Sequence, residues 1–175
     1  MTCADAIFLL GCERNSDIVL GSAYGALIKH YDEESNTVAA IKHTTNEVLK
    51  IMSYYVQKLF AHNMGSETHP VTAFDGQVGP VYSSTTTARH ITILKLVDYN
   101  SKTGQDNAVR VTVEDPRASR ATVTLLFATS EASVNNLPEL GGEARKVTKP
   151  LSESNDRFSV VFTKAYEVVV VEVPN

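Results

Sequence analysis

The sequence contains no tryptophan, and aromatic side chains make up only 7% of its residues. Proteins that bind polysaccharides generally stack sugar rings on flat aromatic side chains, of which tryptophan offers the largest surface. Tyr82 and Tyr99 stand alone in the sequence and predict no such platform. The lack of tryptophan therefore favours a structural role over carbohydrate binding by the chain itself.

Cysteine is equally scarce, and glycosylation sites of the Asn-x-Ser/Thr type are absent. Cys3 and Cys12 fall in one predicted helix, where their separation of about 13 Å excludes a mutual disulfide. No apolar run approaches the roughly 20 residues that span a bilayer. The N-terminus lacks the basic and apolar regions of a secretion signal. The sequence therefore predicts no membrane insertion and leaves the localisation open.

Neither sign of charge is concentrated in one stretch, and the net charge is −4. Domains that bind nucleic acid or a membrane surface usually present a basic stripe, so neither partner is predicted. The oligomeric state is left open. A length of 175 residues suffices for one ordinary domain, or for part of one domain joined to a smaller complete one.

The first part of the chain has the pattern of an α/β domain. Ala4–Cys12 is apolar on nearly every side, which predicts a helix packed against several neighbours. Ser16 can begin a second helix that runs through Leu27. Thr37–Lys42 predicts a short, buried strand of the parallel type. One strand alone does not make a sheet.

A third helix is predicted from Ser53, which can cap it, to a stop at Asn63 and Gly65. An alternative start is Thr44–Glu47, which matches a capping box. We favour Ser53 and expect Val48–Met52 to be a connection or a short strand. The third helix separates a largely helical first part from a second part rich in strands.

From His69 onward, β-branched residues and turn residues predominate. Several short strands separated by turn residues predict an antiparallel β-sandwich. Half-buried strands are predicted from alternating apolar and polar side chains at Val109–Val113, Ala121–Phe127 and Phe158–Phe162. More uniformly apolar stretches predict central strands at Ile91–Val97 and Val168–Val173, and a long loop is predicted at Asn135–Leu151.

Short motifs are spread over nearly the whole chain: Glu13–Asp17, Ser22–Tyr24, Ser53–Phe60 followed by Asn63 and Gly65, Gly79–Tyr82 and Tyr166–Pro174. In this order they resemble the C-terminal part of the α-L-arabinofuranosidases of glycoside hydrolase family 51. The helical motifs are the most specific, because their order, their spacing and the change of architecture agree. The strand region alone is a weaker signal.

The resemblance implies an α+β chain with two parts. Residues 1–65 would be the remnant of the C-terminal end of a (β/α)8 barrel, with helices and one strand. Residues 66–175 would form an antiparallel β-sandwich of the jelly-roll type. The implied enzyme is a retaining glycosidase that removes terminal α-L-arabinofuranosyl groups from hemicellulose or pectin.

Such an enzyme uses two glutamates about 5 Å apart, and in the family both lie upstream of the motif at Glu13–Asp17. No catalytic residue is therefore expected in this chain, which would be inactive alone. No cofactor is implied. The alternative interpretation is a non-enzymatic β-sandwich that acts by contact with a protein or a glycan.

His43 is the candidate substrate contact, because it follows the predicted strand at the position where a barrel binds its substrate. Asn46–Glu47 is similar to the family's acid/base dipeptide, but it falls after the last barrel strand. We expect it in a cap or a loop. Glu33–Glu34 is expected to be a solvated charge cluster.

Neither a metal site nor a nucleophile is predicted from the remaining polar residues. His30, His62, His69 and His90 fall in different predicted elements without a ligand spacing such as His-x-x-x-His. The run Ser83–Thr87 has no Gly-x-Ser-x-Gly turn and no accompanying base, so we expect a strand or loop surface.

Overall fold

The computed structural model describes residues 2–33, 38–74, 76, 79–99, 107–111, 120–128, 145–152, 158–162 and 166–174. The helices are α1 (Thr2–Arg14) and α2 (Met52–His62). The strands are β1 (Ile28–His30), β2 (Ile41–His43), β3 (Val48–Lys50), β4 (Glu67–His69), β5 (Val81–Ala88), β6 (Ile91–Asp98), β7 (Asn107–Val111), β8 (Arg120–Phe127), β9 (Arg145–Ser152), β10 (Phe158–Phe162) and β11 (Val168–Pro174). None of the helices within these ranges is long and apolar enough to cross a membrane.

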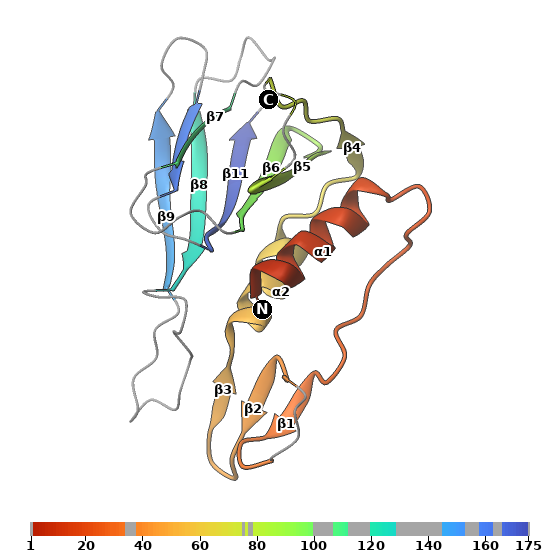
Figure 1. The fold of residues 1–175 in the computed structure, drawn as a ribbon, viewed down its shortest axis with the longest axis vertical. Coiled ribbons are helices and arrows are strands. Elements are labelled where there is room, and N and C mark those ends of the chain that lie inside the picture. The colour runs from red at the N-terminus through yellow and green to blue at the C-terminus, as the bar shows by residue number, and fades with distance from the viewer. Residues whose placement is uncertain are drawn as a thin grey trace.

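A six-stranded sheet with the strand order β4-β5-β6-β11-β8-β9 organises the molecule (Figure 1). All its pairings are antiparallel, and β11 is inserted between β6 and β8. Val168, Val169, Val170 and Val171 are buried on both faces of the sheet. This confirms the prediction of central strands at β6 and β11.

One face of the six-stranded sheet packs against the antiparallel pair β7 and β10. The core between them takes alternate residues of each strand, as the period of two in the sequence predicts. Its buried side chains are Leu94, Leu96, Ala121, Val123, Leu125, Phe158, Val160, Phe162, Val169, Val171 and Val173. The predicted alternation is therefore confirmed for Phe158–Phe162 and for the first half of Ala121–Phe127.

The opposite face of the sheet is covered by α1 and α2 (Figure 1). The sheet contributes Ile93, Val97, Leu126, Val168 and Val170 to this second core, and the helices contribute Cys3, Ala6, Leu10, Val56, Leu59 and Phe60. The fold is α+β with sandwich-like packing, as predicted. Two cores, one on each face, hold the sheet in the middle of the molecule.

Helix α1 forms where the sequence predicts it, and its two cysteines are not bonded to each other. Cys3 lies in the core under the helix, and its burial raises the pKa of the thiol to about 12. The thiol is thus protonated and behaves as a small apolar side chain.

The predicted second helix, Ser16 to Leu27, does not form. The chain runs instead as an irregular segment to β1, and Leu20 is 99% exposed. Two glycines, Gly21 and Gly25, disfavour a helix here, and Ala26 has a left-handed φ of 52°.

The strand predicted at Thr37–Lys42 is replaced by the shorter β2, which begins at Ile41 and ends at His43. It is not alone, because β1 pairs with it in parallel and β3 pairs with it antiparallel. The resulting three-stranded sheet stands away from the six-stranded sheet in Figure 1. The short-strand option for Val48–Met52 is confirmed by β3.

Helix α2 begins at Met52, and its N-cap residue Ile51 makes no side-chain cap. Ser53 therefore does not cap the helix as predicted. Its hydroxyl is buried and donates to the Asp5 carboxylate of α1 at 2.6 Å, which joins the two helices. At the other end, Asn63 is the C-cap and its side-chain amide donates to the Leu59 carbonyl at 2.8 Å.

The Thr44–Glu47 capping box does not start a helix, because these residues form the turn between β2 and β3. The Thr44 amide donates to the Glu47 carbonyl at 2.9 Å, and the Thr44 hydroxyl accepts from the Glu47 amide at 3.1 Å. The same hydroxyl-to-amide bond that caps a helix also closes a turn. The sequence motif alone does not distinguish the two.

Two details of the strand region also differ from the sequence prediction. Residues 145–152 form β9, at a place where the sequence predicts the end of a long loop, and residues 135–144 lie outside the described ranges. Thr124, expected on the solvent side of its strand, is buried, and its hydroxyl is 3.1 Å from the Thr148 hydroxyl. Alternation therefore breaks down in the second half of β8, where both faces are covered.

Truncation of Val123 or Val160 to alanine is expected to destabilise the protein by about 1–3 kcal/mol, because each removes two methyl groups from the first core. Thr122→Ala is the matched control, since Thr122 lies on the same strand and is exposed. Chemical denaturation gives the free energies of unfolding. Equal losses for Val123→Ala and Thr122→Ala would contradict the assigned faces of β8.

Candidate functional site

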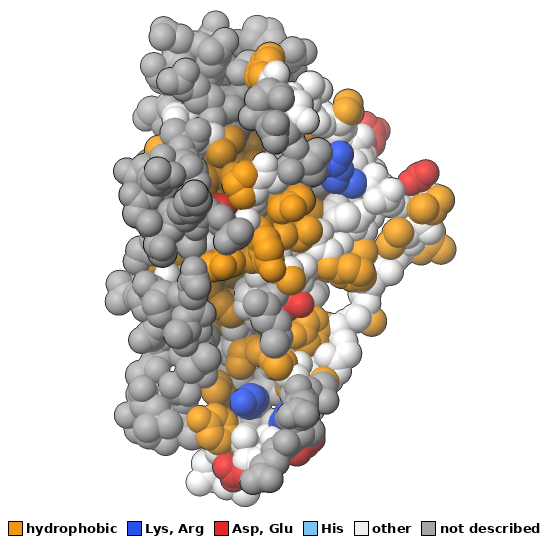
Figure 2. Space-filling model, in the orientation of Figure 1, with side chains coloured by type: hydrophobic (Ala, Val, Ile, Leu, Met, Phe, Trp, Pro, Cys, Tyr) orange, Lys and Arg blue, Asp and Glu red, His pale blue; other side chains and the backbone are white. Residues whose placement is uncertain are grey.

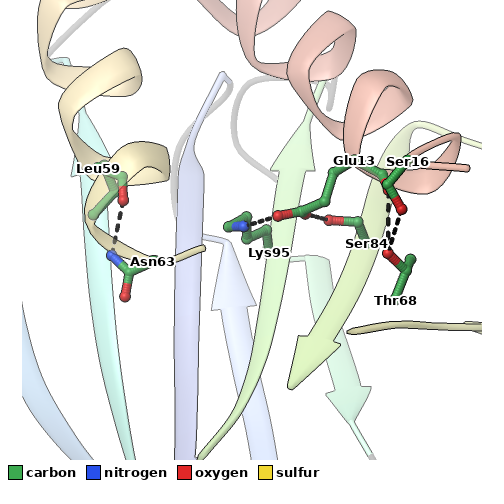
Figure 3. A network of polar contacts seen from close by, with 7 residues as sticks. All are labelled: Glu13, Ser16, Leu59, Asn63, Thr68, Ser84 and Lys95. Carbon is green, nitrogen blue, oxygen red and sulfur yellow. Dashed lines mark hydrogen bonds and ion pairs between the residues drawn. The ribbon is translucent and has the colours of Figure 1, made fainter. Parts of the chain in front are cut away.

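A buried polar cluster joins the C-terminal end of α1 to the six-stranded sheet (Figure 3). One carboxylate oxygen of Glu13 accepts a hydrogen bond from the Lys95 ammonium of β6 and forms an ion pair with it. The other oxygen accepts from the Ser84 hydroxyl of β5. Lys95 is 1% exposed, so the pair replaces the water that an ammonium group would otherwise need.

The electrostatics of Lys95 reflect two opposing effects. Burial lowers the pKa of Lys95, while the hydrogen bond and the charge of Glu13 raise it again. The ammonium nitrogen also lies 5.4 Å from the centre of the Phe60 ring of α2. The charge is thus held by one carboxylate and one aromatic face.

The residues after Glu13 extend the same attachment to neighbouring strands. The Arg14 guanidinium donates to the Ser83 carbonyl of β5 at 3.2 Å. The hydroxyls of Ser16 and Thr68 lie 3.0 Å apart, and the Thr68 hydroxyl donates to the Glu13 carbonyl at 3.3 Å (Figure 3). The polar motif that follows the apolar helix therefore fastens α1 to β4, β5 and β6.

Sequence reasoning missed this cluster, although one signal was present. Lys95 is the single charged residue of Ile91–Val97, where every other side chain except Thr92 is apolar. A charge at such a position needs a partner, because an isolated buried charge is costly. The partner, Glu13, is 82 residues away in sequence, and only the fold brings the two together.

His43, the predicted substrate contact, is the last residue of β2, and His30 is the last residue of β1. The two residues are direct partners in the parallel register. Their ring centroids lie 5.3 Å apart, with an angle of 87° between the planes. The fold therefore places His43 beside His30, which the sequence assigns to a different element.

The other histidines are dispersed. His62 has its Nδ1 atom 2.8 Å from the Lys58 carbonyl within α2, and the His69 Nε2 atom lies 2.9 Å from the Thr87 hydroxyl. His90 is in the turn between β5 and β6. No group of three or more His, Cys, Asp or Glu side chains with the arrangement of a metal site occurs within the described ranges.

The remaining candidates lie apart from one another. Glu47 is in the turn between β2 and β3, Glu33 is exposed after β1, and Glu34 lies outside the described residues. The Ser83–Thr87 run forms part of β5, so of the two expected alternatives, a strand or a loop surface, it is the strand. Of its hydroxyls, that of Ser84 is occupied by Glu13.

Residues 2–165 match the family model of the α-L-arabinofuranosidase C-terminal domain. The chain belongs to this family. α-L-Arabinofuranosidase A of Aspergillus niger is 35% identical over 125 residues, which are 70% of this chain and 19% of that protein. The probable α-L-arabinofuranosidase A of Aspergillus flavus is 34% identical over 122 residues, 69% of this chain and 19% of that protein.

Solved structures of α-L-arabinofuranosidases contain a region with the same fold as this chain. An arabinose-bound GH51 α-L-arabinofuranosidase is similar with a TM-score of 0.82 and 25% identity, over 99% of this chain and 27% of that one. The arabinose complex of the α-L-arabinofuranosidase from Thermotoga maritima gives a TM-score of 0.71 and 18% identity, over 100% of this chain and 39% of that one. The chain thus corresponds to the C-terminal region of α-L-arabinofuranosidases and spans about a fifth of the length of its curated relatives.

Proposed function

We propose that this chain is a non-catalytic part of an α-L-arabinofuranosidase that hydrolyses terminal arabinofuranosides in hemicellulose or pectin. The observation that carries the proposal is the family match over residues 2–165, together with coverage of only 19% of the Aspergillus relatives. The glycan substrate would contain arabinose, as the names of the relatives suggest. The catalytic glutamates would be supplied by the portion that this chain does not contain.

We further propose that residues 1–65 are the end of a barrel and residues 66–175 the sandwich that follows it. Support comes from the small sheet, in which β1 and β2 run in parallel. Parallel strands normally occur in sheets with both faces covered, yet Ile28 of β1 and Val48 of β3 are exposed. The small sheet therefore has the properties expected of part of a larger one.

The apolar surface near these strands supports the same proposal. Large hydrophobic side chains are exposed on α1, on the segment after it and on the small sheet: Phe8, Ile18, Leu20, Leu27, Ile28 and Val48. Figure 2 shows hydrophobic side chains over the helices and along the segment that follows α1. Exposed hydrophobic side chains that gather on one side of a molecule often mark an interface, and the catalytic portion of the enzyme would cover them.

His43 would be a substrate contact in the intact enzyme. It ends a strand that is parallel to its neighbour, and barrels bind substrates at the carboxyl ends of their parallel strands. The half-buried imidazole could donate to or accept from a sugar hydroxyl. We expect it to bind the substrate and to take no part in proton transfer.

The purified chain is expected to release no arabinose from an aryl α-L-arabinofuranoside, because the nucleophile and the acid that the family resemblance implies lie upstream of Glu13–Asp17. The measurement is release of the aryl group at high protein concentration. Glu47→Gln is the matched variant, since Glu47 is the family-like glutamate that this chain does contain. Turnover that disappears in Glu47→Gln would contradict the proposal and make Glu47 catalytic, and turnover that survives would indicate another catalyst in the chain.

A further inference from the structure

The rings of His30 and His43, at the ends of β1 and β2, lie at a separation that suits two ligands of one metal ion. With Zn–N bonds of about 2.1 Å and a tetrahedral angle, the centroids of two coordinating imidazoles lie roughly 5 Å apart. The observed separation between the His30 and His43 rings is 5.3 Å. Because the two residues are partners in the parallel register, the backbone fixes this separation.

The second nitrogen of each ring is already occupied by the local chain. The Nδ1 atom of His43 lies 3.2 Å from the Thr44 carbonyl, which accepts a hydrogen bond from that nitrogen and leaves the lone pair of Nε2 for a metal ion. The Nδ1 atom of His30 lies 3.8 Å from the Asp32 carboxylate and accepts from the Asp32 amide at 3.3 Å. As an acceptor, Nδ1 carries no proton, so ligation through Nε2 requires the ring proton to move to Nδ1 and the bond from the Asp32 amide to break. The Nδ1 proton would then face the Asp32 carboxylate. Carbonyl and carboxylate partners of this kind orient histidine ligands in metal sites.

We propose that His30 and His43 together bind a divalent transition-metal ion of the zinc type, which links β1 to β2. Imidazole nitrogens favour zinc, copper and nickel over magnesium or calcium. Since no third His, Cys, Asp or Glu in the described ranges completes a cluster, water would fill the other positions. The spacing of histidines along the sequence predicts no metal site, and it is the pairing across strands that creates this one.

The ion would stabilise the small sheet formed by β1, β2 and β3. Each of its strands is only 3 residues long, and the sheet stands away from the six-stranded sheet (Figure 1). A ligand that binds only the folded arrangement stabilises it by mass action. This inference does not depend on the proposed enzyme function, because it concerns two strands of this chain. It excludes a simultaneous direct contact of His43 with a sugar, since Nδ1 faces the Thr44 carbonyl and Nε2 would bind the ion.

The test is titration of the full chain with zinc chloride, followed by calorimetry. His30→Ala and His43→Ala are each expected to weaken binding at least about tenfold, because each removes one of two protein ligands. His90→Ala is the matched control, since His90 is exposed in a turn of the other sheet, and its affinity should equal that of the unchanged chain. Equal affinity in all three variants, or no measurable binding by the unchanged chain, would overturn the proposal.

A second measurement keeps the test valid if an alanine variant unfolds. Nickel, which is paramagnetic, should broaden the imidazole NMR signals of His30 and His43 in the unchanged chain at concentrations that leave His62 and His90 unaffected. Simultaneous broadening of all the histidine signals would overturn the proposal, because it would mean non-specific binding to separate imidazoles.

Discussion

Replacement of Glu13 by alanine is expected to destabilise the protein by about 3 kcal/mol, because it leaves the Lys95 ammonium buried without its carboxylate. The Ser84 hydroxyl loses its acceptor in the same variant. Chemical denaturation measures the loss. Asp17→Ala is the control, since Asp17 is an exposed acid just beyond the same helix.

The double variant Glu13→Ala with Lys95→Met separates the effect of the unpaired charge from the effect of lost packing. If the unpaired charge is the cause, the double variant should be more stable than Glu13→Ala alone, because methionine removes the buried ammonium. A loss of under half a kcal/mol for Glu13→Ala, of the size typical for surface substitutions, would mean that the ion pair does not stabilise the attachment of α1.

Deletion of residues 1–65 is expected to abolish cooperative unfolding of the remaining sandwich. The number of strands predicted after residue 66 would by itself suggest the opposite, namely that residues 66–175 close a core of their own and behave better than the whole chain. The packing reverses this expectation, because α1 and α2 cover one entire face of the central strands. The shortened chain should bind hydrophobic dyes and resist proteases less well than the full chain. A dye-silent, protease-resistant fragment would show that the sandwich closes without the helices.

Two substitutions on α1 provide a matched control for the deletion. Leu10 is 2% exposed in the core shared with the sheet, whereas Phe8 on the same helix is 63% exposed. Leu10→Asp should reproduce the dye binding of the deletion, because it places a charge in that core. Phe8→Asp should leave the free energy of unfolding nearly unchanged. Similar behaviour of the two variants would contradict the assigned faces of α1.

The strands were the part of the fold that the sequence predicted best. Alternation in Ala121–Phe127 and Phe158–Phe162 identifies the buried side chains correctly, because a strand with one covered face imposes a period of two. The prediction failed for Thr124, where both faces are covered and the period disappears. It also failed for the helix from Ser16, because a capping residue and scattered apolar residues do not show whether a surface exists for the helix to cover.

The sites were harder to predict than the elements. The motif at Glu13–Asp17 was recognised, but its contacts to β4, β5 and β6 depend on pairings across 52 to 82 residues. The proximity of His30 and His43 depends on the register of two parallel strands, which no local pattern encodes. Both arrangements follow from the order in which the strands pair. That order depends on packing between distant segments, which local sequence patterns do not reveal.

The position of β11 has a consequence for the order in which the protein can assemble. Among the described strands it comes last along the chain, yet it joins β6 to β8 in the six-stranded sheet. During synthesis on the ribosome, the β5–β6 and β8–β9 hairpins can form early, but they remain two separate pieces until β11 has emerged. Contacts of such long sequence separation form slowly, so we expect the valine side chains of β11 to complete both cores together, after the hairpins have formed.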